Sequence, residues 1–174
     1  MIGASVRSSP RAAARGSVVI LSRAEVVRLP HWQGAFAGER KDHRLYELIE
    51  DTIHQGFDYR YFVIRDDRGE VRAIQPFFIV DQDLCAGTGR HVRSVVGLVR
   101  RLWPRFLRLR TLMVGCAGGE AHLDGQEQSH SATAEILAVS ITRLARDLKA
   151  PLIVLKEFPA QYRDPLQCFV RHAF

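Results

Sequence analysis

The chain has 174 residues, of which 47% are hydrophobic and 25% charged, as in an ordinary soluble globular domain. Its apolar runs are far shorter than the ~20 residues that a membrane-spanning helix needs, so no transmembrane segment is expected. The formal net charge of +6 is compatible with an anionic partner such as a nucleotide cofactor, a nucleic acid or a membrane surface, and it selects none of them.

Residues 1–16 contain arginines and small residues but no acidic residue. They lack the apolar core of a secretory signal, so we interpret them as a disordered leader before one domain over 17–174. A mitochondrial-type presequence is the alternative. The three cysteines, Cys85, Cys116 and Cys168, are odd in number and widely spaced, which argues against a disulfide framework and favours the reducing cytoplasm.

The first predicted elements are a strand and a helix. Residues 17–21, "SVVIL", form a short apolar strand candidate, and 31–39 are typical of a loop with aromatic anchors. Residues 40–56 have leucine and isoleucine at helical spacing, and Gly56 could end this helix.

A hairpin is expected next. Residues 59–65 are aromatic and β-branched, "DDRG" at 66–69 is typical of a tight turn, and 70–80 form the returning strand. Pro76 has no N–H to donate to a ladder, so it marks a bulge or an edge position.

Residues 90–103 are expected to form an amphipathic helix that ends before Pro104. Its valines lie on one face and its arginines lie largely elsewhere. We expect the apolar face to pack on the sheet and the arginines to be solvated. A membrane-surface or nucleic-acid role would need clustering that the sequence does not reveal.

The last third of the chain predicts a strand, a long helix and a second strand at 109–115, 131–150 and 151–158. The strand 151–158 is a continuous apolar run, so we expect it to be buried. A final helix over 160–174 must have Pro165 in its first turn or be broken by it. The strand–helix–strand unit predicts a parallel pair, and the hairpin predicts antiparallel pairing, so the fold class is mixed α/β.

The hairpin "YFVIRDDRGEVRAIQPFFIV" with the strand, loop, long helix and strand that follow resembles the GNAT acyltransferase fold. The closest likeness is to the FemAB-like, peptidoglycan-biosynthesis-type branch, which also suits the extra helix at 90–103. The hairpin positions that carry this likeness are Asp67, Gly69, Val71, Ala73, Pro76 and Phe77.

The resemblance implies transfer of an acyl group from an acyl-CoA, such as acetyl-CoA, to a small-molecule or peptide amine. It implies pantetheine between two separated parallel strands, and pyrophosphate at the N-terminus of the following helix. The stretch "TLMVGCAGGEAHLD" at 111–124 leaves the central strand toward that helix. Glu120 or His122 is then the candidate general base. The candidate cofactor contacts are Val114, Gly118, Gly119, Gln126, Ser129 and Ser131.

Each of these residues also has a plainer interpretation. The glycines are common turn residues after a strand, Glu120 could be a solvated carboxylate, and Ser131 could be a simple helix cap. Lys156 and Glu157 could contact substrate or form an adjacent ion pair. Cys116, Glu120, His122 and Asp124 could ligate a metal, but their spacing matches no common zinc pattern, so no metal is expected.

Two departures from the family pattern leave other functions open. In "QEQSHS" at 126–131, serines replace both glycines of the GNAT fingerprint, and the chain ends at Phe174 before the C-terminal strands that the family has. We therefore expect the N-terminal part of a longer protein and a homodimer through an unpaired sheet edge. An aminoacyl-tRNA-dependent transferase acting on a cell-wall precursor and a non-catalytic GNAT-like binding module are the alternatives.

Overall fold

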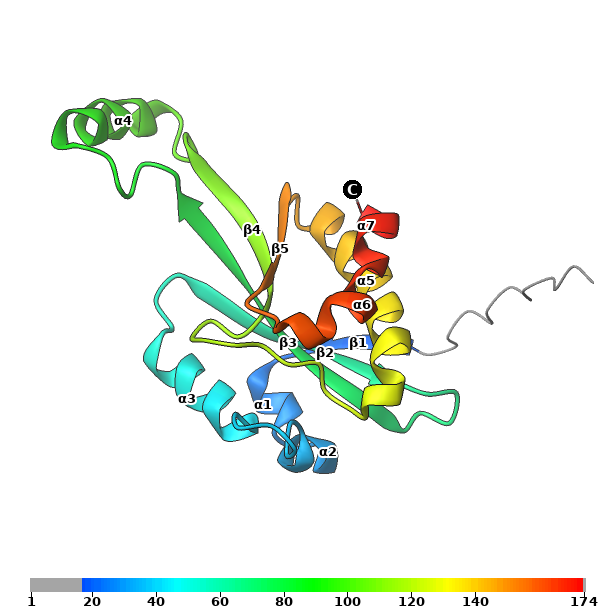
Figure 1. Cartoon of the computed structure of the whole chain (residues 1–174). Helices are drawn as coiled ribbons and strands as arrows, with labels where there is room; N and C mark the ends of the chain where they lie inside the picture. Colours follow the sequence, from blue (N-terminus) through cyan, green and yellow to red (C-terminus); the bar gives the residue numbers. More distant parts are fainter. Residues whose placement is uncertain (1–16, 174) are drawn as a thin grey trace, which may run out of the picture.

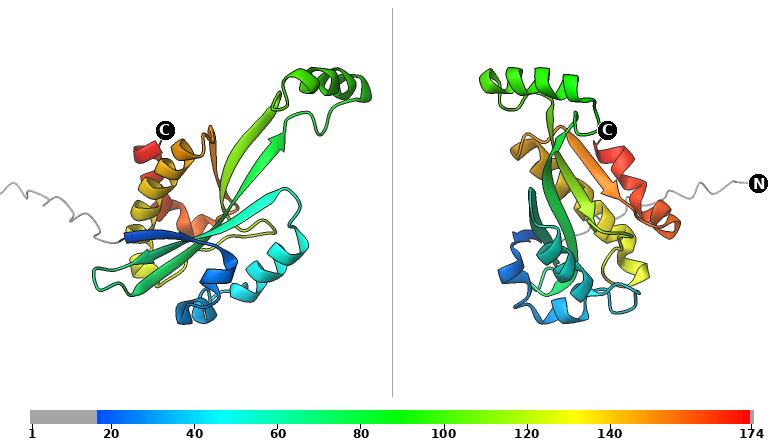
Figure 2. Two further views of the ribbon diagram at one scale, coloured as in Figure 1. Left: turned by 180° about the vertical axis from the view of Figure 1, so that it is seen from behind. Right: turned by 90° about the vertical axis from the view of Figure 1, so that its left-hand side faces the viewer.

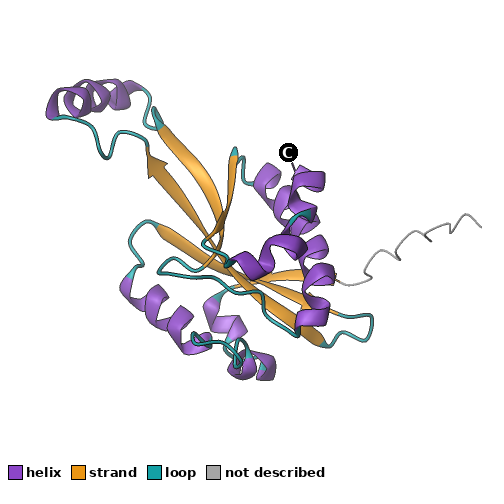
Figure 3. Cartoon of the chain, in the orientation of Figure 1, coloured by secondary structure: helices purple, strands orange, loops and turns teal. Residues whose placement is uncertain are grey.

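A single five-stranded sheet forms the centre of the protein (Figures 1 and 3). The computed structural model describes residues 17–173, so the expected leader at 1–16 lies outside the described residues. The strand order is β1-β2-β3-β4-β5. The bounds are β1 Ser17–Leu21, β2 Phe57–Arg65, β3 Val71–Asp83, β4 Arg108–Gly115 and β5 Leu152–Lys156.

The sheet is mixed, as the sequence predicts. β1 to β4 pair antiparallel in chain order, and β4 and β5 pair parallel. Pro76 lies opposite Tyr61 of β2, and Phe77 is the first residue of β3 that is paired with β4. Pro76 thus falls on the part of β3 whose second edge is not covered by β4, which confirms the predicted edge position.

Helices cover both faces of the sheet, and the alternation of side chains along β2 assigns each face to one core. Phe62 and Ile64 pack with Leu137 and Ile141 of α5 (His130–Asp147) in one cluster. Tyr61 and Val63 belong to the other, which also contains residues of α1 (Arg23–Val26), α2 (Pro30–Gly34) and α3 (His43–Thr52). No helix within residues 17–173 is long and apolar enough to cross a membrane.

The segment before α3 is more ordered than the sequence predicts. The short helix α2 begins at Pro30 and extends into the expected loop 31–39, because the fixed φ of proline suits the first position of a helix. α3 begins later than expected, after Asp42, whose carboxylate accepts a hydrogen bond from the Arg44 N–H at the helix N-terminus. Gly56 lies in the turn beyond α3 and adopts a positive φ.

The prediction for the amphipathic helix was right about the helix and wrong about its packing. α4 (Arg90–Leu102) ends before Pro104, as expected. However, β3 and β4 extend together beyond the rest of the sheet, and α4 sits at the end of this arm, away from the sheet (Figure 2). Arg100 holds α4 to the arm through two hydrogen bonds of 2.7 Å to the Asp83 carboxylate. These bonds hold the pKa of Asp83 well below its usual range.

The C-terminal elements also differ from the prediction. The helix expected over 160–174 is divided into the 3-10 turn η2 (Ala160–Tyr162), α6 (Arg163–Leu166) and α7 (Cys168–Ala173). Pro165 lies in the first turn of α6, which is one of the two positions that the sequence allows. β5 is partly exposed rather than fully buried, and Leu152 at its start is 38% exposed to solvent. β5 pairs only with β4 in the described part of the chain, so one of its edges has no strand partner.

We propose that this edge of β5 pairs between two copies of the chain, since unpaired edges are templates for another strand. Leu152→Lys should place a charge beside the edge and shift the protein toward monomer, whereas Val170→Lys, at an exposed position on α7, should not. Sedimentation velocity across a concentration series measures both. A wild-type monomer at high concentration, with the amides of β5 protected from exchange, would contradict the proposal.

Candidate functional site

A long loop connects β4 to α5 and turns back beside the end of β5. The turn begins at Gly115, where φ is +123°, and a side chain there would collide with Ala121 and with the carbonyl of Lys156. After the turn, the Ala121 N–H donates to the Glu157 carbonyl at 3.0 Å. Glycine is therefore required at the end of β4, and the loop that follows is fixed against β5.

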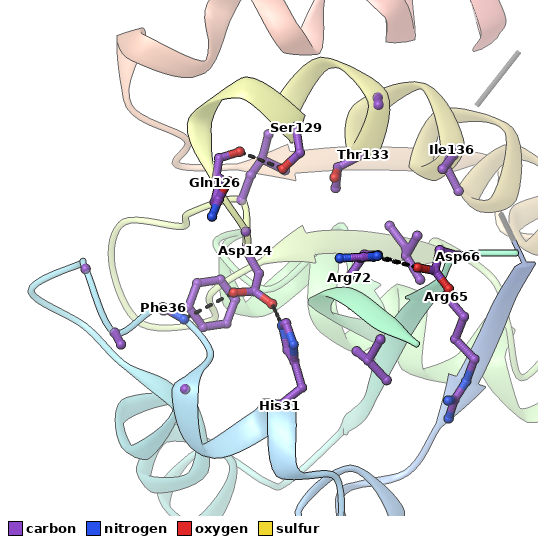
Figure 4. A pocket seen from close by; sticks show the side chains of 18 of the residues that line it. His31, Phe36, Arg65, Asp66, Arg72, Asp124, Gln126, Ser129, Thr133 and Ile136 are labelled. Atoms are coloured by element: carbon purple, nitrogen blue, oxygen red, sulfur yellow. Dashed lines mark hydrogen bonds and ion pairs between the residues drawn. The ribbon is translucent and has the colours of Figure 1, made fainter. Parts of the chain in front are cut away.

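Asp124, near the end of this loop, is a buried junction between distant segments. Its carboxylate accepts hydrogen bonds from the Ile74 N–H of β3 at 2.8 Å and from the Phe36 N–H at 3.2 Å. It also lies 2.9 Å from Nε2 of His31 in α2 (Figure 4). Only 4% of Asp124 is exposed, so one carboxylate joins the loop, β3 and the α2–α3 segment in the interior.

A second buried polar group lies two residues before Asp124. His122 Nδ1 is 3.2 Å from the Glu39 carboxylate and 3.4 Å from the Tyr162 hydroxyl. Burial raises the pKa of Tyr162, so its hydroxyl keeps its proton and can donate to Glu39, at 3.2 Å. Glu39 thereby connects His122 to the surface of a pocket.

This pocket has a volume of about 650 Å³ and lies between the N-terminus of α5, the segment after α2 and the tip of the β2–β3 hairpin. In Figure 4, Gln126, Ser129 and Thr133 form one wall, and His31 and Asp124 lie across from them. Its size falls within the range of small-molecule sites. Its polar side chains are His31, Glu39, Arg65, Asp66, Arg72, Asp124, Gln126, Ser129 and Thr133.

The electrostatics of the pocket favour an anionic group on the α5 side. α5 has 18 residues, and the backbone N–H groups of its first turn carry partial positive charge. Arg72 reaches the same pocket from the hairpin. Arg72 forms an ion pair with Asp66, which orients its guanidinium there. Arg65 also lines the pocket, but its guanidinium points away from α5 and donates to the Gly69 carbonyl.

The structure brings together only some of the residues that the sequence suggests as a site. Gln126 and Ser129 line the pocket, whereas Ser131 does not. Glu120 is exposed on the loop and also lies outside the pocket lining. His122 is buried behind the pocket and reaches it only through Glu39.

The remaining candidates lie around the ends of β4 and β5. Gly118 packs beside Ile49 of α3, and Gly119 lies close to the Lys41 ammonium. Lys156 and Glu157 form the adjacent ion pair of the plainer interpretation, with Nζ and Oε1 2.6 Å apart.

The separation of two parallel strands implied by the resemblance is absent. β4 and β5 stay in register from Thr111 opposite Leu152 to Gly115 opposite Lys156. Val114 lies opposite Phe77 on one side and Leu155 on the other. Its backbone therefore has strand neighbours on both edges, and a pantetheine chain could not pair with it without displacing one of them.

The metal interpretation gains no support from the geometry. Within residues 17–173, no group of three or more histidine, cysteine, aspartate or glutamate side chains is arranged to hold an ion. Cys116 is buried, and burial raises the pKa of its thiol, so the reactive thiolate is disfavoured.

Sequence reasoning missed His31, Glu39, Arg72 and Tyr162, and it considered Asp124 only as a metal ligand. The usable signal was the alternation of Glu120, His122 and Asp124, because it places these three polar side chains on one side of an extended segment. Nothing local in the sequence indicates that His31 would lie against Asp124.

Comparison with known proteins establishes the fold alone. No protein-family model matches the chain, and no curated protein is detectably similar to it in sequence. In structure, the chain is similar to a ribosomal-protein-alanine N-acetyltransferase from Brucella melitensis biovar Abortus 2308, with a TM-score of 0.52 and 14% identity over 92% of each chain. The predicted GNAT-type mixed sheet flanked by helices is thereby confirmed, while the FemAB-like branch receives no support.

Proposed function

We propose that this protein is an N-acyltransferase that moves an acyl group from an acyl-CoA to an amine. The observation that carries the proposal is the pocket, in which the N-terminus of α5 and the His31–Asp124 pair face each other. The likeness in fold to a protein described as an N-acetyltransferase supports the same reaction type. Fold alone does not determine function, so the roles below depend on the geometry of the site.

The donor would bind with its phosphates on the α5 side of the pocket. The backbone N–H groups of the first turn of α5 and the Arg72 guanidinium supply positive charge there, and Gln126 and Ser129 supply polar contacts. The phosphates would therefore bind at the helix N-terminus, as the resemblance implies. The rest of the donor would lie in the pocket and not between β4 and β5.

His31 would act as the general base. When its Nε2–H donates to Asp124, Nδ1 carries the lone pair, and the side chain lines the pocket with 31% of its surface exposed. The amine nitrogen attacks the thioester carbonyl carbon, so that a C–N bond forms and the C–S bond breaks. His31 takes the proton from the amine and returns it to the departing thiolate. Glu120 and His122 are the competing candidates, and they lie outside the pocket lining.

Filling the pocket should weaken donor binding. Ala132 is exposed on α5 and lines the pocket, so Ala132→Phe should weaken acetyl-CoA binding at least about tenfold by occupying its volume. Val139→Phe, at an exposed position of the same helix outside the pocket lining, is the matched control. Calorimetric titration gives the affinities, and ligand-induced shifts in melting temperature should agree with them.

Two outcomes would contradict this proposal. If wild-type protein does not bind acetyl-CoA at millimolar concentration, the tRNA-dependent and non-catalytic alternatives become the better hypotheses. If acetyl-CoA binds equally well to Ala132→Phe and to Val139→Phe, the donor site lies outside the pocket.

A further inference from the structure

The α4 arm carries an apolar surface that the rest of the described chain does not cover. α4 stands at the tip of the extended β3–β4 ladder in all views (Figures 1 and 2). No substantial packing joins it to another helix or strand within residues 17–173. Val96 is the one large apolar residue of α4 that is buried.

The exposed side chains form one continuous face. Helical spacing places Val92, Val95, Leu98 and Leu102 on the same side of α4, with exposed fractions of 48%, 64%, 64% and 93%. Trp103 follows directly after the helix and is 66% exposed. We call these five residues the apolar face of α4. An apolar face of this kind marks an interaction site.

The opposite side of α4 is strongly basic. Residues 84–119 contain seven arginines and neither aspartate nor glutamate. Arg100 and Arg110 are paired with Asp83 and Asp81 of β3. Five other arginines of this segment make no ion pair within residues 17–173: Arg90, Arg93, Arg101, Arg105 and Arg108.

We propose that α4 and Trp103 form a docking surface for an anionic membrane. A helix lying in the membrane interface places its apolar side chains at the boundary of the acyl chains, while its arginines reach acidic headgroups. Tryptophan is enriched at that depth because its ring is amphipathic. An anionic membrane would thus bury the apolar face of α4 and also pair with the arginines of the basic segment.

Two other partners fit these observations less well. A second copy of α4 could bury the apolar face, but it would bring two basic, acid-free helices together without compensating charge. RNA could pair with the arginines, but it would leave the apolar face of α4 in water. This docking does not depend on the proposed acyl transfer, since it uses none of the pocket residues.

Vesicle binding tests the proposal with the full chain. Wild-type protein should sediment with vesicles of phosphatidylcholine and phosphatidylserine, and not with phosphatidylcholine alone. High salt should weaken the binding because it screens the arginines. Replacing Leu98 and Leu102 with serine should weaken it at least about tenfold by removing buried apolar surface. Leu48→Ser, at a 57% exposed leucine of α3, should leave binding unchanged.

Tryptophan fluorescence gives a second measurement. The chain has two tryptophans, and Trp32 is buried, so a blue shift upon addition of anionic vesicles would report insertion of Trp103. Trp103→Phe should abolish the shift. Failure to bind anionic vesicles would overturn the proposal. So would a dimer that the double serine variant dissociates, or vesicle binding that depends on the arginines and not on the leucines.

Discussion

Asp124→Ala is expected to lower the free energy of unfolding by about 3 kcal/mol, because it leaves two buried backbone N–H groups without an acceptor. Those groups belong to Ile74 in β3 and to Phe36 after α2, and the same substitution releases His31. Chemical denaturation monitored by circular dichroism measures the change. The variant should also lose the activity that depends on an oriented His31.

The control for this prediction is Asp67→Ala. Asp67 is an exposed aspartate in the hairpin turn, so its loss should change the free energy of unfolding by only a few tenths of a kcal/mol. Similar stabilities for the two variants would mean that Asp124 is not the junction that we describe.

His31→Gln is expected to lower the rate of acyl transfer by about 10²-fold or more, the usual contribution of a general base. Glutamine can still donate a hydrogen bond to Asp124 but cannot accept the proton of the amine. The free energy of unfolding should therefore change little, and kcat should fall more than KM rises. Steady-state kinetics with acetyl-CoA and a panel of amines provides the measurement.

Glu120→Gln and His122→Gln serve as comparisons in the same assay. Glu120 is exposed on the loop, so we expect that variant to keep its activity. His122 is packed with Glu39 and Tyr162, so its replacement should affect stability as well as rate. A rate loss confined to Glu120→Gln would place the chemistry at the loop and contradict the role of His31.

Local pattern explains which parts of the fold could be predicted. The hairpin of β2 and β3 and the helix α5 follow from periodicity and a short turn, and the parallel pairing of β4 with β5 follows from the strand–helix–strand order. The packing of α4 could not be predicted in this way, because amphipathicity shows that a helix has an apolar face and not what covers it. Pro76 was interpretable because a missing N–H restricts where a residue can lie in a sheet.

The site was less predictable because it is assembled from distant segments. His31 and Asp124 are 93 positions apart, and Glu39 and Tyr162 are 123 apart. Gln126 and Ser129 were found from the resemblance, which implies a phosphate contact at the start of the long helix, and the start of that helix is a local signal. The rest of the pocket depends on how the α2–α3 segment folds over the loop after β4, and no spacing in the sequence encodes that contact.

An amide chemical-shift titration of the full chain with acetyl-CoA tests the proposed donor site most directly. If the pocket is the donor site, the largest changes should fall on residues 125–133 at the start of α5 and on 36–39 opposite. Ala132→Phe should remove these changes. Changes confined to 115–120 and 156–158, at the ends of β4 and β5, would instead place the donor between the strands and contradict the proposal that the pocket binds it.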